Sequence, residues 1–189
     1  AWNTIVEQPK RAAAGERKSG SVRFDLPRKA SPVTALRQES EVRFPSGIGE
    51  LDRVLGGGIV KGSLILVGGA PGIGKSTLML QICSQLCQGG KVLYVSGEES
   101  EYQLKLRCQR LRAESENLYV LSETRLSDLL EAVDAEEPEV LIVDSIQTLS
   151  DDALDSAAGS IAQVKSCTLT LMELAKRRGI TVFVIGHIN

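Results

Sequence analysis

The sequence predicts an α/β domain with a doubly wound, mainly parallel sheet. Short apolar segments alternate with longer segments of helical character from about residue 64 to the end of the 189 residues. These segments are apolar at successive positions, which is typical of parallel strands covered by helices on both faces. A glycine-rich loop follows the first such strand and leads into a helix. This order favours an open sheet whose ligands bind at the carboxyl ends of its strands.

The expected elements follow one another regularly along the chain. Glycines after the helical segments, such as Gly89 and Gly179, fit helix C-caps. A polar loop of small residues precedes the last helix. The expected strands are 64–67, 92–95, 118–121, 140–143 and 181–185, the helices are 50–55, 77–88, 99–112, 126–135 and 162–178, and the polar loop is 150–160.

Residues 1–43 differ in composition from the rest and are expected to form an extended arm or linker beside a folded domain at 44–189. They carry nine Lys and Arg against five Asp and Glu, whereas the whole chain has a net charge of −2. Trp2 and Phe24 are candidate anchors of this arm. Its basic balance is a weak indication of a polyanionic partner, and a solvated tail is the alternative.

The loop from Gly69 to Ser76 matches the phosphate-binding pattern G-x-x-x-x-G-K-[ST]. Glycines let the backbone turn its N–H groups toward one phosphate, and the following helix N-terminus adds a positive dipole end. Lys75 is expected to reach the β- and γ-phosphates of ATP or ADP, and the Ser76 hydroxyl to ligate Mg²⁺. The predicted nucleotide-binding residues are Gly69, Ala70, Pro71, Gly72, Ile73, Gly74, Lys75, Ser76 and Thr77.

Carboxylates follow two of the predicted strands and complete a catalytic set with Lys75. Asp144 comes directly after the strand 140–143, in the Walker-B arrangement, where it would hold Mg²⁺ directly or through water. Glu98 and Glu99 follow the strand 92–95, and one of them is placed to polarise an attacking water. Glu98 is the preferred base, while both glutamates could also act only as charges at a helix N-terminus.

Two further polar residues lie near the same predicted edge. His187, the only histidine, ends the last strand, and Gln147 lies just past Asp144. Either residue is placed to sense the γ-phosphate, with a plain structural role as the alternative.

The composition argues against a membrane-spanning protein and against a fold stabilised by a zinc site. No apolar run reaches the roughly 18–20 residues of a membrane span, and no secretory leader is evident. The cysteines lack the spacing of zinc ligands and are expected to be small buried residues in a reducing cytoplasm. They are Cys83, Cys87, Cys108 and Cys167.

Several segments, taken with the phosphate loop, resemble the RecA-like ATPases and, within them, the RadA family of bacterial DNA repair proteins. These are SGIGELDRVLGGG at 46–58, YVSGEES at 94–100, LIVDSIQT at 141–148 and GHIN at 186–189. The resemblance implies a RecA-like P-loop NTPase core at 44–189. It also implies that Glu98 is the catalytic glutamate and that His187 couples nucleotide state to DNA contacts.

The same resemblance implies a partner and an assembly. Members of the family form ring-shaped hexamers that bind single-stranded DNA and drive branch migration in recombinational repair, alongside other recombination proteins. The loop 150–160 would face the ring channel, with Gln163 and Lys165 as DNA neighbours. The family's four-cysteine zinc finger and Lon-protease-like domain are not in this sequence. We therefore expect a fragment of the family's full length, with zinc only in the missing finger.

Two other functions use a phosphate loop and stay open. A small-molecule or nucleoside kinase would need an arginine-rich lid over the γ-phosphate, which the sequence does not display. A non-hydrolysing, nucleotide-gated assembly module would not need the complete set of Lys75, Ser76, Glu98 and Asp144. A DNA-dependent ATP hydrolase is therefore the favoured prediction.

Overall fold

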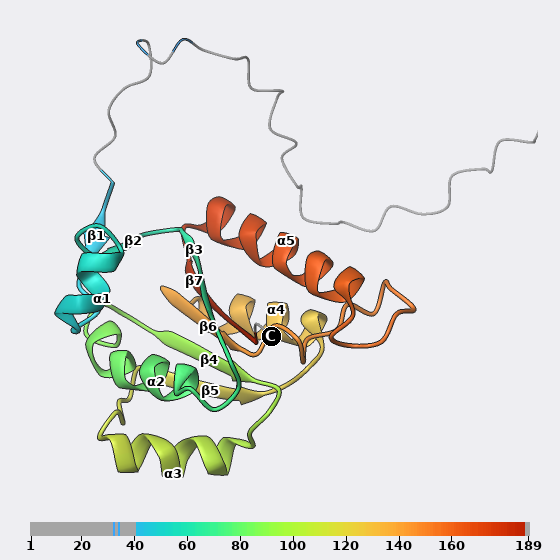
Figure 1. Ribbon diagram of the computed structural model, residues 1–189, viewed down its shortest axis with the longest axis horizontal. Coiled ribbons are helices and arrows are strands. Elements are labelled where there is room, and N and C mark those ends of the chain that lie inside the picture. Colours follow the sequence, from blue (N-terminus) through green and yellow to red (C-terminus); the bar gives the residue numbers. More distant parts are fainter. Residues whose placement is uncertain (1–31, 33, 35–40, 188–189) are drawn as a thin grey trace, which may run out of the picture. The chain divides into compact units, whose positions relative to one another are not determined.

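The computed structural model describes residues 32, 34 and 41–187, and its centre is a five-stranded parallel sheet (Figure 1). The strand order is β3-β7-β6-β4-β5, so consecutive strands of the chain are not always neighbours. This arrangement confirms the predicted fold class. The strands are β3 (Leu64–Gly69), β4 (Val92–Ser96), β5 (Leu118–Ser122), β6 (Val140–Asp144) and β7 (Thr181–His187).

Helices cover both faces of this sheet, as a doubly wound fold requires. In Figure 1, α2 and α3 lie on one side of the sheet and α4 and α5 on the other. Two separate clusters of buried apolar side chains correspond to these two layers. The helices are α2 (Lys75–Leu86), α3 (Glu101–Leu111), α4 (Leu126–Glu136) and α5 (Ile161–Arg178).

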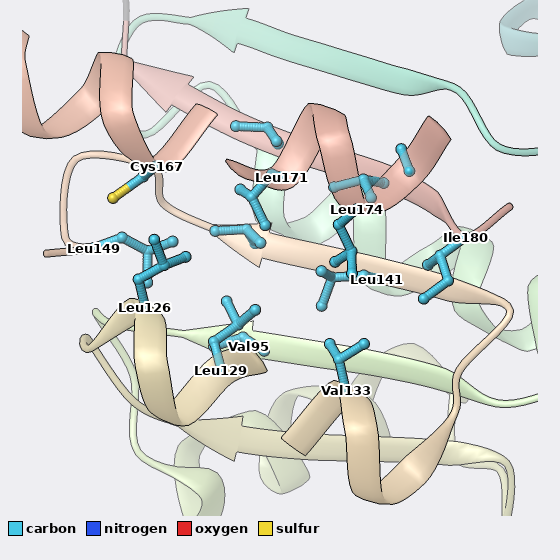
Figure 2. Close-up of a cluster of buried hydrophobic side chains, with 14 of the residues drawn as sticks. Val95, Leu126, Leu129, Val133, Leu141, Leu149, Cys167, Leu171, Leu174 and Ile180 are labelled. Atoms are coloured by element: carbon cyan, nitrogen blue, oxygen red, sulfur yellow. The ribbon is translucent and has the colours of Figure 1, made fainter. Parts of the chain in front are cut away.

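The strands are apolar at successive positions because each face meets a different helical layer. On β4, Leu93 and Val95 belong to the cluster under α4 and α5, whereas Val92 and Tyr94 belong to the cluster under α2. Figure 2 shows the first cluster, to which α5 contributes Leu171 and Leu174 and α4 contributes Leu129 and Val133. Burial of such side chains supplies the main stabilisation of the fold.

Local residues define the helix ends. Gly74 precedes α2 in a left-handed conformation (φ 100°), so the helix begins at Lys75, two residues earlier than predicted. Ser100 begins α3 with a capping box, because its hydroxyl accepts from the Gln103 N–H while the Gln103 side chain accepts from the Ser100 N–H. Gly179 ends α5 as the predicted C-cap (φ 69°).

A small second sheet precedes the phosphate loop. β1 (Arg43–Phe44) pairs antiparallel with β2 (Ile59–Val60), and α1 (Gly49–Val54) lies between them in the chain. The sequence did not predict β2, because two residues give no periodicity. Gly58 allows the pairing, since its φ is 125° and a Cβ there would approach the Phe44 carbonyl oxygen to 2.8 Å.

Most of the predicted arm, including Trp2 and Phe24, lies outside the described residues, so the division into an arm and a domain stays a prediction. All four cysteines are free and buried, as expected. Among the residues with described structure, no helix combines the length and apolarity needed to cross a bilayer.

Candidate nucleotide site at the carboxyl edge

The register of the sheet brings the predicted site residues to one edge. Gly69 at the end of β3 pairs with His187 at the end of β7. Asp144 at the end of β6 pairs with Ser96 at the end of β4. Because all these strands are parallel, their carboxyl ends lie together at the edge where open α/β sheets bind ligands.

The phosphate loop runs from the end of β3 into the first turn of α2 and leaves its tip open to solvent. Residues 70–74 are exposed, whereas Gly69, Ser76 and Thr77 are partly buried. Lys75 is only 8% exposed, and its ammonium donates to the carbonyl oxygens of Gly69 (2.8 Å) and Ala70 (2.9 Å). The Lys75 ammonium therefore lies inside the curve of the loop, at the position where the sequence predicts a bound phosphate.

Asp144 is a buried carboxylate with one satisfied and one unsatisfied oxygen. The Tyr94 hydroxyl donates to Oδ2 at 2.7 Å, while Oδ1 has no hydrogen-bond partner. Burial, and then the Asp144 charge, raise the pKa of Tyr94, so its hydroxyl remains protonated and donates. The period of two along a strand places Asp144 on the face of Ile142, which packs in the cluster under α2.

The donors near Asp144 fit a magnesium ion. A buried carboxylate oxygen without a partner is costly unless a cation or water satisfies it. Asp144 faces the side of the sheet where Ser76 lies in the first turn of α2. Carboxylate and hydroxyl oxygens are ligands that Mg²⁺ accepts, and it usually keeps several waters as well. The role of Asp144 and Ser76 as Mg²⁺ ligands stays a prediction.

The turn after β4 places Glu98. The Ser96 hydroxyl accepts from the N–H groups of Glu98 (3.2 Å) and Glu99 (3.0 Å). The Gly97 N–H donates to the Asp144 carbonyl oxygen at 3.0 Å. A Cβ at position 97 would overlap the Thr148 side chain, so only glycine lets the turn lie this close to the segment that follows β6.

Different partners hold the two adjacent glutamates. Glu98 Oε1 accepts from the Ser145 hydroxyl at 2.8 Å and from His187 Nε2 at 3.1 Å. Desolvation raises the pKa of Glu98, but the hydrogen bonds from His187 and Ser145 and the positive charge of Lys75 act against it, so this pKa lies below its usual value. Glu99 forms an ion pair with Arg107 of α3 at 2.6 Å. Glu98 thus belongs to the cluster at the sheet edge, and Glu99 belongs to the α3 surface.

The sequence profile of the AAA domain matches residues 30–189. The chain belongs to the AAA domain family.

Curated relatives of this AAA domain carry the name DNA repair protein RadA, which confirms the resemblance found in the motifs. The relative from Bacillus subtilis (strain 168) is 47% identical over 191 residues, covering 100% of this chain and 42% of the relative. The Synechocystis relative is 49% identical, covering 93% and 38%. The Campylobacter jejuni relative is 53% identical over 152 residues, covering 80% and 34%. The chain spans between 34% and 42% of the length of these relatives.

The two candidate sensors of the AAA domain meet at the end of β7. His187 Nδ1 lies 3.2 Å from the Lys75 ammonium, so this side chain contacts both Lys75 and Glu98. The Gln147 amide donates to the His187 carbonyl oxygen at 3.2 Å, and its Oε1 is buried without a partner. Both side chains lie where sensing of a phosphate was predicted, and that role stays a prediction.

Sequence reasoning missed Tyr94 and Ser145. Tyr94 is a hydroxyl-bearing residue in an otherwise aliphatic part of β4, two positions before the strand end. Ser145 directly follows the predicted metal ligand Asp144. Each signal is a lone polar group beside a predicted site residue, which is suggestive only after the strand register is known.

One expected DNA neighbour in the AAA domain has another role. Gln163 is buried, and its side chain accepts from the Asp151 N–H (2.7 Å) and donates to the Ser156 carbonyl oxygen (2.9 Å). The prediction that Gln163 contacts DNA is therefore wrong, because its amide holds the loop before α5 in place. Lys165 is exposed, and its role toward DNA stays a prediction.

Proposed function

We propose that this AAA domain hydrolyses ATP with Mg²⁺ at the carboxyl edge of its sheet. The observation that carries the proposal is the cluster in which His187 contacts both the phosphate-loop lysine Lys75 and the carboxylate of Glu98. A binding module needs the lysine, but it has no use for a carboxylate that reaches the same cluster through His187.

The proposed chemistry assigns one role to each group. Lys75 would neutralise charge on the β- and γ-phosphates, and Ser76 and Asp144 would hold Mg²⁺, which would supply further positive charge there. Glu98 accepts a proton as a water oxygen bonds to the γ-phosphorus. The bond from the γ-phosphorus to the bridging oxygen breaks, giving ADP and inorganic phosphate.

The relatives' name, DNA repair protein RadA, leads us to propose that the longer protein is a DNA-dependent ATPase of recombinational repair. In this proposal a homo-hexamer in the cytoplasm binds single-stranded DNA, drives branch migration and works with other recombination proteins. Among the described residues, Arg107 of α3 is paired with Glu99 on the α3 surface and not with the cluster at the sheet edge. We therefore expect the neighbouring subunit to supply the cation that completes the site.

Phosphate release with and without single-stranded DNA tests the proposal. The wild-type chain, or the longer protein if the chain turns over slowly, should release phosphate from Mg²⁺·ATP and do so faster with DNA. DNA binding should weaken steeply as salt rises, because it is largely electrostatic.

Lys75→Ala supplies the negative control, with Lys61→Ala as its matched lysine substitution. Loss of one charge-assisted contact costs about 1.5–3 kcal/mol, so Lys75→Ala should weaken ATP binding about 10- to 100-fold by calorimetry. Lys61 is an exposed lysine paired with Glu139, and its removal should leave binding unchanged. Phosphate transfer to a small-molecule acceptor would instead identify a kinase. Tight binding of ATP without phosphate release would identify an assembly module.

A further inference from the structure

The Glu98 carboxylate is held on one side only. Both of its donors, the Ser145 hydroxyl and His187 Nε2, reach the same oxygen, Oε1. No donor from residues 41–187 reaches Oε2, and the side chain is 42% exposed. One oxygen is therefore fixed by the protein while the other faces the open side of the site.

Lys75 determines which nitrogen of His187 can be a donor. A lysine ammonium has donors and no acceptor, so His187 Nδ1, 3.2 Å from Lys75 Nζ, must accept. The imidazole is then neutral with its proton on Nε2, and Nε2–H donates to Glu98. The contact to Glu98 is thus available only in the tautomer that Lys75 selects.

We propose that Ser145 and His187 are positioning residues that hold Oε1 of Glu98 and leave Oε2 to take the proton of the attacking water, with Lys75 selecting the required His187 tautomer. This inference rests on the proposed hydrolysis, but its tautomer part can be tested without turnover. Ser145 is fully buried, and the turn through Gly97 fixes Glu98 against the end of β6, so the grip is built into the fold.

Phosphate binding should be transmitted through the same contacts. Each of the three ammonium donors of Lys75 has an acceptor: the carbonyl oxygens of Gly69 and Ala70, and His187 Nδ1. Phosphate oxygens form stronger, charge-assisted hydrogen bonds, so Lys75 must give up at least one of these partners. The contact to His187 is the longest of the three, and its loss leaves Nδ1 without a donor.

Nitrogen NMR of the histidine side chain tests the tautomer directly. His187 is the only histidine of the chain, so a long-range ¹H–¹⁵N spectrum contains one imidazole. We expect a neutral ring protonated on Nε2 in the nucleotide-free chain and a mixture of tautomers in Lys75→Ala. Saturation with Mg²⁺ and a non-hydrolysable ATP analogue should shift Nδ1 more than Nε2. A ring protonated on Nδ1, or an Nδ1 signal unmoved at saturation, would overturn the role of Lys75.

Variants of the two donors test the grip on Glu98. Ser145→Ala and His187→Ala should each lower turnover about tenfold, short of the ~10²–10⁴-fold that a general base contributes, with the KM for ATP nearly unchanged. Ser145→Thr keeps a hydroxyl and should restore turnover. His187→Gln should also retain most of it, because its amide offers an acceptor to Lys75 and a donor to Glu98.

Ser46→Ala is the matched control, because Ser46 is an equally buried serine whose hydroxyl bonds only to the Ile48 backbone. Its turnover should equal that of the wild type. If Ser145→Ala fails to bind nucleotide, the comparison of His187→Ala with His187→Gln tests the inference in its place. Full turnover in both alanine variants would overturn the inference, whereas a wild-type protein that never releases phosphate contradicts the proposed function instead.

Discussion

The two edges of the central sheet hold their charges in opposite ways. At the amino edge, Lys61 pairs with Glu139 (2.8 Å) and Lys91 with Glu136 (3.1 Å), and all four side chains are open to water. At the carboxyl edge, Lys75 is 8% and Asp144 only 4% exposed, and Asp144 keeps an oxygen without a partner. Lysines and carboxylates are therefore paired and solvated at the amino edge, whereas at the carboxyl edge they are buried and one oxygen of Asp144 lacks a partner.

This difference separates groups that serve stability from groups that serve a ligand. Exposed ion pairs contribute little to folding, because water screens them and ordering long side chains costs entropy. Buried polar groups without partners destabilise the folded state, so they persist where a ligand or metal completes them. Substitutions at the carboxyl edge should consequently alter binding and turnover, and substitutions at the amino edge should alter stability slightly.

The largest effect should separate the two adjacent glutamates. Glu98→Gln should lower turnover about 10²–10⁴-fold, because it removes the base but keeps its shape. Glu99→Gln, which breaks only the pair with Arg107, should hydrolyse ATP nearly as fast as the wild type. Phosphate release measured at saturating ATP compares them, and the opposite ranking would show that Glu99 is the base.

A smaller effect should appear in the metal requirement. Tyr94→Phe keeps the buried ring but removes the donor to Asp144 Oδ2. Loss of a partner behind a metal ligand typically costs 10–100-fold in metal affinity, so the Mg²⁺ concentration needed for tight ATP binding should rise by about that factor. Calorimetric titrations at graded Mg²⁺ measure this. Tyr119→Phe, on β5 beside Lys91, is the control and should behave as wild type.

The ionisation of Glu98 should also appear in the pH dependence of stability. Its pKa is lower in the folded chain than its usual value, so the ionised form favours folding. That contribution is complete above the pKa of an unfolded glutamate and is lost as the pH falls through the lower, folded value. Denaturant unfolding from about pH 7 to about pH 3 should show the wild type losing more stability than Glu98→Gln. Parallel curves would mean that Ser145 and His187 do not favour the charged carboxylate.

The smallest effect belongs to the amino edge. Lys61→Ala should change the free energy of unfolding by about 0–1 kcal/mol, because its partner Glu139 is half exposed. Urea unfolding would measure this change, and nucleotide affinity should not move. A large loss of stability in Lys61→Ala would contradict the claim that ion pairs at the amino edge contribute little to folding.

Sequence alone predicted the elements that repeat and the motifs with strict spacing. The continuous apolar runs predicted all five strands of the sheet, and the phosphate-loop pattern predicted Lys75 because its glycines and lysine have a fixed spacing between a strand and a helix. Asp144 and Glu98 followed from their positions after strands. The two-residue strand Ile59–Val60 was not predicted, because it is too short to show a periodic pattern.

Contacts between segments that are distant in the chain could not be predicted from the sequence, for a physical reason. The hydrogen bond from Tyr94 to Asp144 spans 50 residues of chain and depends on which strands are neighbours, an order that alternating elements do not reveal. Gln163 was misassigned because its amide turns inward to the loop at 151–156, and a polar residue near a helix start carries no sign of that direction.

The position of β3 has a consequence for how the phosphate loop responds to a ligand. Within residues 41–187, β3 pairs only with β7, and Leu66 on this strand is exposed. The loop therefore continues at one end into the first turn of α2, where Lys75 is buried, and at the other end into a strand that is hydrogen-bonded along a single edge. A strand held on one side opens at lower free energy than a central strand. The loop can then yield at its β3 end when phosphate enters, while α2 keeps its donors aimed at the ligand.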